Sequence, residues 1–267
     1  MSDEKRKTTI DDWCVYYGSR TKSEGSVQRP ADKDFRNLPH FELLNTIGSY
    51  FRMGDLIEVG AGDSALLVDV ALRYKPTRSV GLDYLVDACR RLKNRAQQAN
   101  AEIEVICSDL FDPGNELVGT FDLVMSHGVV EHFTDLSGVI EAISLFAKPK
   151  GIVFTLIPNI KGSVYKYLMK KWDRKIYNAH VPYDVKDLMV AHQQAGLRVL
   201  ECRYFMSSNF GMLSWCFVNR NKSGLTYWSY VQLTRVSKFL WWWENRFGLL
   251  PATRMFAPYI ICVAQKD

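Results

Sequence analysis

The sequence predicts an α/β fold with a doubly wound, Rossmann-like and mostly parallel sheet of seven strands. Short apolar runs alternate with amphipathic segments at a spacing typical of right-handed βαβ units. The apolar runs are nearly continuous, as in strands that helices cover on both faces. The 267 residues suffice for one such domain with added segments.

Each predicted element is bounded by a change in the residue pattern. Strands are expected at residues 55–59, 78–83, 103–107, 121–126, 151–157, 197–205 and 258–264. Helices are expected at residues 35–52, 65–74, 84–99, 136–146 and 185–195. Asp135 is placed to be the N-cap of the fourth helix, and Gly196 ends the fifth.

Two long segments, residues 158–182 and 206–256, interrupt the alternation. Segments of this length usually form a lid or substrate wall at the carboxyl edge of the sheet. We therefore expect a helical cap segment at residues 1–53, an α/β domain at residues 54–205 and 257–267, and an aromatic-rich insertion (lid or substrate wall) at residues 206–256.

Composition narrows the class of protein. The net charge of +5 is too small to argue for a nucleic-acid partner, and no two of the six cysteines are spaced as a zinc site or redox pair, so buried reduced thiols are expected. The charged N-terminus has no secretory signal, and no apolar run reaches about 20 residues, so a cytoplasmic protein is expected. Residues 1–33 are polar and expected to be irregular, apart from Trp13, Tyr16 and Tyr17.

A glycine-rich turn follows the first strand. Residues 60–65 (Gly-Ala-Gly-Asp-Ser-Ala) satisfy the dinucleotide-binding pattern, and Asp83 lies about 20 residues further on. NAD would place a pyrophosphate over this loop, where Glu58 and Asp63 stand. Each like-charge approach at roughly 4 Å would cost about 4 kcal/mol. S-adenosylmethionine carries an ammonium and a sulfonium instead, and the two carboxylates favour it.

With these residues in place, the sequence resembles class I S-adenosylmethionine-dependent methyltransferases of the small-molecule branch, over residues 50–205 and the last strand. The segments that carry the resemblance are Glu58-Val59-Gly60-Ala61-Gly62, Gly81-Leu82-Asp83, Ser108-Asp109-Leu110, Phe121–Ser126 with Val130-Glu131-His132-Phe133, and Ala147–Val153. The resemblance implies that the α/β domain is a methyltransferase domain that uses S-adenosylmethionine and releases S-adenosylhomocysteine.

The resemblance also implies roles for individual residues. Glu58 with Gly60, Ala61 and Gly62 would hold the methionine part of the cofactor, and Asp83 its ribose. Asp109 and Leu110 would hold the adenine, with Tyr84 stacked beside it. Ser126 and His127 would face the sulfonium.

Methyl transfer to a hydroxyl or an acidic carbon benefits from a general base, most often histidine. His127, His132 and His180 are the candidates, because the first two follow the fourth strand and the third lies in a loop beside the expected acceptor. A structural role competes for His132 and for Glu131. His40 and His192 are interpreted as surface or packing residues. Tyr16 and Tyr17 could close over the cofactor.

Two branches of the family are disfavoured. The tetrad of amino-methyltransferases is replaced here by Ser126-His127-Gly128-Val129, and Pro158-Asn159 offers only one of the ligands that metal-dependent catechol enzymes need. Neither a nucleic-acid substrate nor a metal is therefore expected.

The acceptor side is aromatic and basic. Six of seven tryptophans lie beyond residue 170, and residues 161–175 hold six basic side chains. An apolar or anionic small molecule is the expected acceptor: a natural product, a glycan, or a prenyl or lipid-linked compound, with O-methylation slightly favoured. Residues 226–250 also suit peripheral contact with a membrane. An NAD-dependent Rossmann oxidoreductase and a non-catalytic partner subunit of methyltransferase fold are the alternatives.

Overall fold

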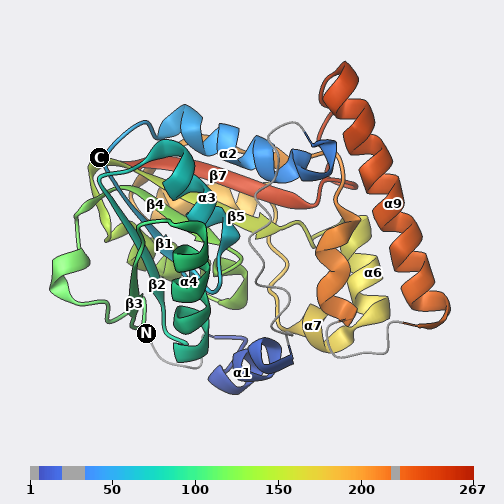
Figure 1. The fold of residues 1–267 in the computed structure, drawn as a ribbon, viewed down its shortest axis with the longest axis horizontal. Helices are drawn as coiled ribbons and strands as arrows, with labels where there is room; N and C mark the ends of the chain where they lie inside the picture. The colour runs from blue at the N-terminus through green and yellow to red at the C-terminus, as the bar shows by residue number, and fades with distance from the viewer. Residues whose placement is uncertain (1–5, 20–33, 218–222) are drawn as a thin grey trace.

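The computed structural model describes residues 6–19, 34–217 and 223–267, with the side chains of residues 17–19 left out, and it has the predicted α/β fold (Figure 1). Its seven-stranded sheet has the order β3-β2-β1-β4-β5-β7-β6; β7 pairs antiparallel with β5 and β6, and the other pairs are parallel. The predicted doubly wound, mostly parallel sheet is confirmed. The strands are β1 (Asp55–Val59), β2 (Arg78–Asp83), β3 (Glu104–Cys107), β4 (Phe121–His127), β5 (Ala147–Pro158), β6 (Leu197–Phe205) and β7 (Tyr259–Lys266).

Helices cover both faces of the sheet, because successive strand residues point to opposite sides. In β1, the fully buried Leu56 packs in the core beneath α2 and α3, whereas its neighbour Ile57 packs in the core beneath α5 and α8. Asp135 caps α5 as predicted, by accepting a hydrogen bond from the Gly138 N–H. The main helices of this part are α2 (Leu38–Tyr50), α3 (Ala65–Tyr74), α4 (Val86–Ala99), α5 (Leu136–Ser144) and α8 (Val185–Gln194).

The N-terminal segment contains a helix, α1 (Ile10–Ser19), where an irregular chain was expected. The prediction was wrong because tertiary contacts, rather than local pattern, hold this segment. Arg6 forms an isolated β-bridge with Phe133, and the Lys7 N–H donates to the carbonyl of His132 at 2.7 Å. These contacts bring α1 across the loop that follows β4.

The two long insertions pack against each other as one aromatic layer. α6 (Val164–Trp172), α7 (Arg174–Asn178), the 3-10 segment η6 (Phe210–Phe217) and α9 (Gly224–Phe247) lie together beside the sheet (Figure 1). The ring of Trp172 lies 5.5 Å from that of Phe217 and 6.4 Å from that of Tyr230. The residues between β5 and α8 and those between β6 and β7 therefore build a single wall.

Two expectations drawn from composition are modified. Cys14 and Cys107 are exposed, so the expectation that the thiols are buried is wrong for these two. No helix in the described ranges has the length and hydropathy needed to cross a membrane.

Candidate active site

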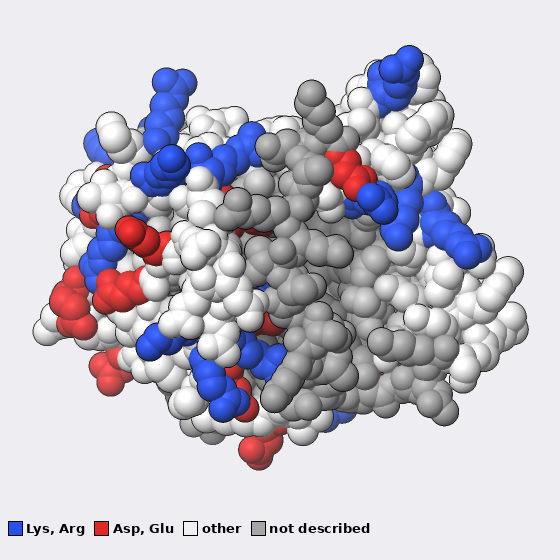
Figure 2. Space-filling model, in the orientation of Figure 1, with Lys and Arg blue, Asp and Glu red and all other residues white. Residues whose placement is uncertain are grey.

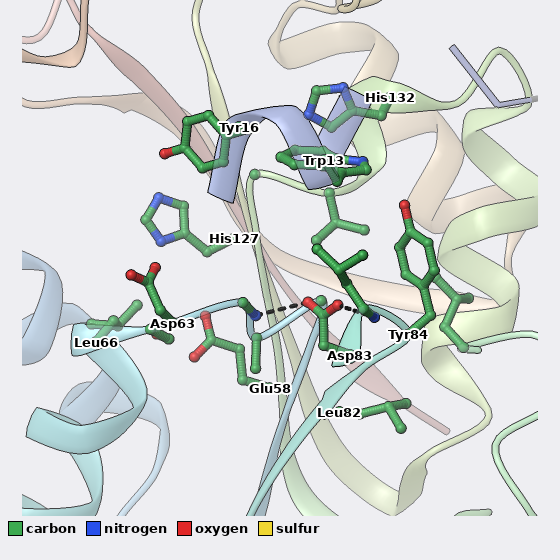
Figure 3. A pocket seen from close by; sticks show the side chains of 18 of the residues that line it. Trp13, Tyr16, Glu58, Asp63, Leu66, Leu82, Asp83, Tyr84, His127 and His132 are labelled. Carbon is green, nitrogen blue, oxygen red and sulfur yellow. Dashed lines mark hydrogen bonds between the residues drawn. The ribbon is translucent and has the colours of Figure 1, made fainter. Parts of the chain in front are cut away.

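A cavity of about 390 Å³ opens at the carboxyl ends of β1, β2 and β4 (Figure 3). This is the point where the strand order reverses, since the chain runs outward from β1 to β3 and returns to the other side of β1 with β4. Ligands of doubly wound sheets bind at this switch point. The loop after β1, the end of β2, the loop after β4 and the helix α1 line the cavity.

The turn after β1 places backbone, rather than side chains, against the cavity. Gly60 and Gly62 have φ angles of +68° and +54°, which favour glycine. A Cβ on Gly60 would lie 2.4 Å from the side chain of Val129. Ser64 then caps α3, by accepting a hydrogen bond from the Leu67 N–H at 3.0 Å. Gly60, Ala61 and Gly62 all line the cavity, as their predicted role requires.

Asp83 ends β2 and faces the same cavity (Figure 3). One carboxylate oxygen accepts from the Gly62 N–H at 2.8 Å, and the other accepts from the Leu85 N–H at 2.9 Å. Burial raises the pKa of Asp83, and these backbone hydrogen bonds oppose the rise. Because a carboxylate oxygen has two lone pairs, each can still accept from a ligand hydroxyl. Paired ribose hydroxyls fit this arrangement.

Glu58 is buried at the floor of the cavity, and its Oε2 has no hydrogen-bond partner among the described residues. Burial, together with the charge of Asp83, raises the pKa of Glu58 to about 8, against the lowering effect of Ser64. A buried acid with an unused oxygen is satisfied by a ligand that brings a positive charge.

The other acid of the loop is already compensated. Asp63 lies 3.7 Å from the guanidinium of Arg95, which comes from α4. Asp63 therefore disfavours the binding of an anionic ligand less than the sequence suggested. Glu58 and Asp83 are the acids that favour a cationic ligand over a pyrophosphate.

The N-terminal segment closes one side of the cavity. The sequence pattern did not predict that Arg6 would take part in this. The Arg6 guanidinium lies 5.3 Å from the centre of the Tyr84 ring and donates to Asp109 at 2.5 Å. Trp13 and Tyr16 of α1 also line the cavity, with ring centres 5.9 Å apart (Figure 3). The side chain of Tyr17 lies outside the described residues.

The predicted adenine residues lie at different depths. Leu110 lines the cavity, whereas the carboxylate of Asp109 lies behind the lining, held by Arg6 and by the Phe111 N–H at 3.0 Å. Tyr84 lines the cavity next to Arg6, and burial raises the pKa of its phenol to about 12, so it stays neutral. Asp109 is therefore positioned to orient Arg6, and Leu110 with Tyr84 to contact a flat ligand.

His127 ends β4 and projects into the cavity (Figure 3). The side chain is exposed at the cavity surface, and desolvation by the protein around it, with a contribution from His40, lowers its pKa to about 4, so the imidazole is neutral at pH 7. His40, which the sequence placed on the surface or in packing, also lines the cavity, with its Nε2 2.6 Å from Asp69. Ser126 is buried behind His127, and its hydroxyl has no partner among the described residues.

The other two candidate bases lie together. The ring centres of His132 and His180 are 4.6 Å apart, and only His132 reaches the cavity lining. Trp215, from the second insertion, lies 6.2 Å from His180 and lines the cavity as well. The fifth histidine, His192, is buried in packing, as expected.

Comparisons with known proteins agree with this geometry. Residues 57–153 match the methyltransferase domain family. The chain is 27% identical over 110 residues to the ubiquinone biosynthesis O-methyltransferase of Chromobacterium violaceum, a match that covers 41% of this chain and 47% of that relative. The chain thus spans about half the length of the curated relative it matches.

Two solved structures have a similar fold at low sequence identity. Geranyl diphosphate C-methyltransferase from Streptomyces coelicolor, in complex with Mg²⁺, geranyl diphosphate and S-adenosylhomocysteine, has a TM-score of 0.57 and 11% identity, over 97% of this chain and 98% of that one. The [4+2]-cyclase SpnF has a TM-score of 0.58 and 13% identity, over 85% of this chain and 80% of that one. At such identities the likeness concerns the fold alone.

Proposed function

Because residues 57–153 identify the chain as one that carries a class I S-adenosylmethionine-dependent methyltransferase domain, we propose that it transfers the methyl group of S-adenosylmethionine to a small-molecule acceptor. The family match confirms the predicted family and its cofactor. The observation that carries the proposed activity is that Glu58, whose Oε2 has no hydrogen-bond partner among the described residues, lines the cavity together with Asp83. A ligand with an ammonium at one end and a ribose in the middle complements these two acids.

The cofactor would supply the reactive methyl group, and the chain's residues would orient it. Glu58 and the backbone of residues 60–62 would bind the amino-acid end, and Asp83 the ribose. Leu110 and Tyr84 would contact the adenine. In this arrangement His127, neutral at pH 7, would be the general base.

We propose an apolar, hydroxyl-bearing acceptor and O-methylation. The side of the cavity next to α1 is lined by aromatic rings, those of Trp13, Tyr16 and Trp215, which favour a flat or prenylated molecule. The names of the Chromobacterium relative and of the Streptomyces structure, which concern ubiquinone and geranyl diphosphate, support an isoprenoid-related acceptor.

A membrane surface is the proposed location of such an acceptor. The outer face of α9 exposes Trp228, Phe239 and Trp242 next to the basic Arg235 and Lys238. Figure 2 shows basic side chains along this side of the molecule. Aromatic rings with interspersed cations are typical of helices that lie at the lipid interface. Co-sedimentation with vesicles containing anionic lipid tests this, and binding that survives Trp242→Ser with Phe239→Ser would contradict it.

Ligand-induced stabilisation tests the proposed activity. S-adenosylhomocysteine is expected to raise the melting temperature, whereas NAD is not. Stabilisation by NAD alone would support an oxidoreductase, and no stabilisation by either would support a non-catalytic partner subunit. Incubation with S-adenosylmethionine and prenylated phenols, followed by mass spectrometry, then identifies the acceptor by the gain of one methyl group.

A further inference from the structure

Beside the cofactor cavity, three buried side chains converge with their acceptor atoms toward one another. They are Glu131 and His132, in the turn after β4, and His180, in the first insertion. One ligand-capable atom from each lies within 4.8 Å of those of the other two. The exposed fractions of the three residues are 1%, 5% and 6%. A backbone hydrogen bond from the Val181 N–H to the carbonyl of Glu131, at 2.7 Å, ties the two segments together.

The two imidazoles are held in the tautomer that a metal ligand requires. Nδ1 of His132 lies 2.8 Å from the carbonyl of Ala179, and Nδ1 of His180 lies 2.7 Å from the carbonyl of Ile176. A carbonyl can only accept, so each Nδ1 carries the hydrogen, and each Nε2 presents a lone pair. Histidines that bind metals are usually oriented in this way by a backbone carbonyl or a carboxylate.

The inward-facing atoms lack partners. Nε2 of His132, Nε2 of His180 and both carboxylate oxygens of Glu131 have no hydrogen-bond partner among the described residues. No described Lys or Arg forms a salt bridge with Glu131. Buried acceptors without donors are costly, and a cation shared among them removes that cost.

We propose that Glu131, His132 and His180 form a binding site for one divalent first-row transition metal, such as Zn²⁺ or Fe²⁺. These metals bind two imidazoles and one carboxylate and keep further coordination positions open for other ligands. Mg²⁺, by contrast, prefers ligands that are all oxygen atoms. Ligands at bonds of about 2.1 Å lie roughly 3.4 Å apart around a tetrahedral ion, so the three side chains would close by about an ångström on binding. This replaces the expectation of no metal, which rested on the pattern of catechol enzymes.

The site lies next to the cofactor cavity, so a metal bound there could activate the acceptor; this role rests on the proposed function. His132 lines the cavity, and Trp13 packs against its ring at 5.1 Å, so an open metal position would lie at the acceptor's side. An acceptor hydroxyl bound there would lose its proton to the neutral imidazole of His127. Its oxygen would then form the new C–O bond as the S–CH₃ bond breaks and S-adenosylhomocysteine leaves. The metal would lower the pKa of the acceptor hydroxyl, and His127 would keep its proposed role as the general base.

Calorimetry of the full chain, stripped with a chelator and titrated with Zn²⁺, tests the site. One equivalent is expected to bind wild type, with a rise in melting temperature. Glu131→Gln keeps the size of the side chain and removes its charge. It is expected to weaken Zn²⁺ binding by more than about 100-fold, since even partners behind the ligands contribute about 10–100-fold. The intensity of the visible absorption of bound Co²⁺ reports the coordination number of the metal.

The control variant is His192→Gln, which alters a buried histidine outside the cluster and is expected to bind Zn²⁺ as wild type does. S-adenosylhomocysteine affinity is measured in every variant. A Glu131→Gln protein that binds S-adenosylhomocysteine but not Zn²⁺ supports the site. Equal Zn²⁺ affinity in wild type and Glu131→Gln, no saturable binding to wild type, or binding of Mg²⁺ in preference to Zn²⁺ overturns it. If the wild type does not bind S-adenosylhomocysteine, the proposed function, rather than the metal site, is refuted.

Discussion

Replacing Glu58 by Gln removes the charge that would bind the cofactor's ammonium and leaves the side chain's size unchanged. An ion pair at about 4 Å with an effective dielectric near 20 contributes about 4 kcal/mol. The carboxyl has a pKa of about 8, so ionising it at pH 7 costs about 1.4 kcal/mol. The difference of about 2.6 kcal/mol predicts that Glu58→Gln binds S-adenosylhomocysteine about 100-fold more weakly at pH 7.

Binding must also displace the proton that Glu58 holds in the ligand-free protein. At pH 7 about nine tenths of the carboxyl is protonated, and a cationic ligand ionises it. The ligand's amine stands beside its own carboxylate and is already protonated at pH 7. Wild type should therefore release about nine tenths of a proton per ligand at pH 7, and the release should diminish as pH rises above about 8.

Calorimetry in buffers of different ionisation enthalpy measures this release. Glu58→Gln should show none, and neither should wild type with methylthioadenosine, which lacks the amine. Since the pKa of Glu58 is higher in the folded than in the unfolded chain, ligand-free stability falls as pH rises from about 4.5 to 8. The variant should therefore melt no lower than wild type at pH 8. Equal heats in all buffers with wild type, or unchanged affinity in the variant, would refute this assignment of Glu58.

Three further substitutions test other parts of the site and fold. His127→Ala should lower kcat by about 100-fold with near-normal S-adenosylhomocysteine affinity, and undiminished turnover would contradict its role as a base. Because His127 in the wild type is neutral above its pKa of about 4, its titration should leave kcat/KM constant from pH 6 to 8. Trp13→Ala removes a ring contact with His132, and calorimetry should show S-adenosylhomocysteine affinity reduced by roughly 2- to 10-fold; unchanged affinity would show that α1 does not cap the ligand. Asn159→Ala removes two buried hydrogen bonds of 2.9 Å, to the carbonyls of Arg254 and Ala257, and urea unfolding should show a loss of about 2–4 kcal/mol; a loss below about 1 kcal/mol would contradict the importance of this bridge.

Three strands have the predicted bounds: β1 and β2, which are buried, and the edge strand β6, which is partly exposed. The bounds of β1 and β2 agree with the predicted residues 55–59 and 78–83, because each strand is an apolar run between turn residues. The glycine turn and Asp83 were likewise predictable, since a local pattern of residue types places them at the same sheet edge.

Features that depend on contacts distant in sequence were not predictable in this way. Arg6 reaches the site through Asp109, more than one hundred positions away, and no periodicity marks that pair. The sequence predicted the charge of Asp63 correctly, but it did not predict the neutralisation of that charge by Arg95, which lies in α4, beyond α3 and β2. His180 was chosen as a base from its position in a loop, and its convergence with His132 becomes visible only in three dimensions.

The position of β7 has a consequence for how the chain assembles. β7 lies between β5 and β6, and Phe205 of β6 is paired with Tyr259 only after the whole second insertion has intervened. During synthesis, β6 would emerge with no partner on the sheet and expose a strand edge until residues 259–266 follow. Closing that long connection is slow, because it costs conformational entropy. The aromatic layer of α6, η6 and α9 therefore forms either before β7 joins the sheet or only after it has done so. Folding of this half of the molecule is thereby tied to the formation of the aromatic layer.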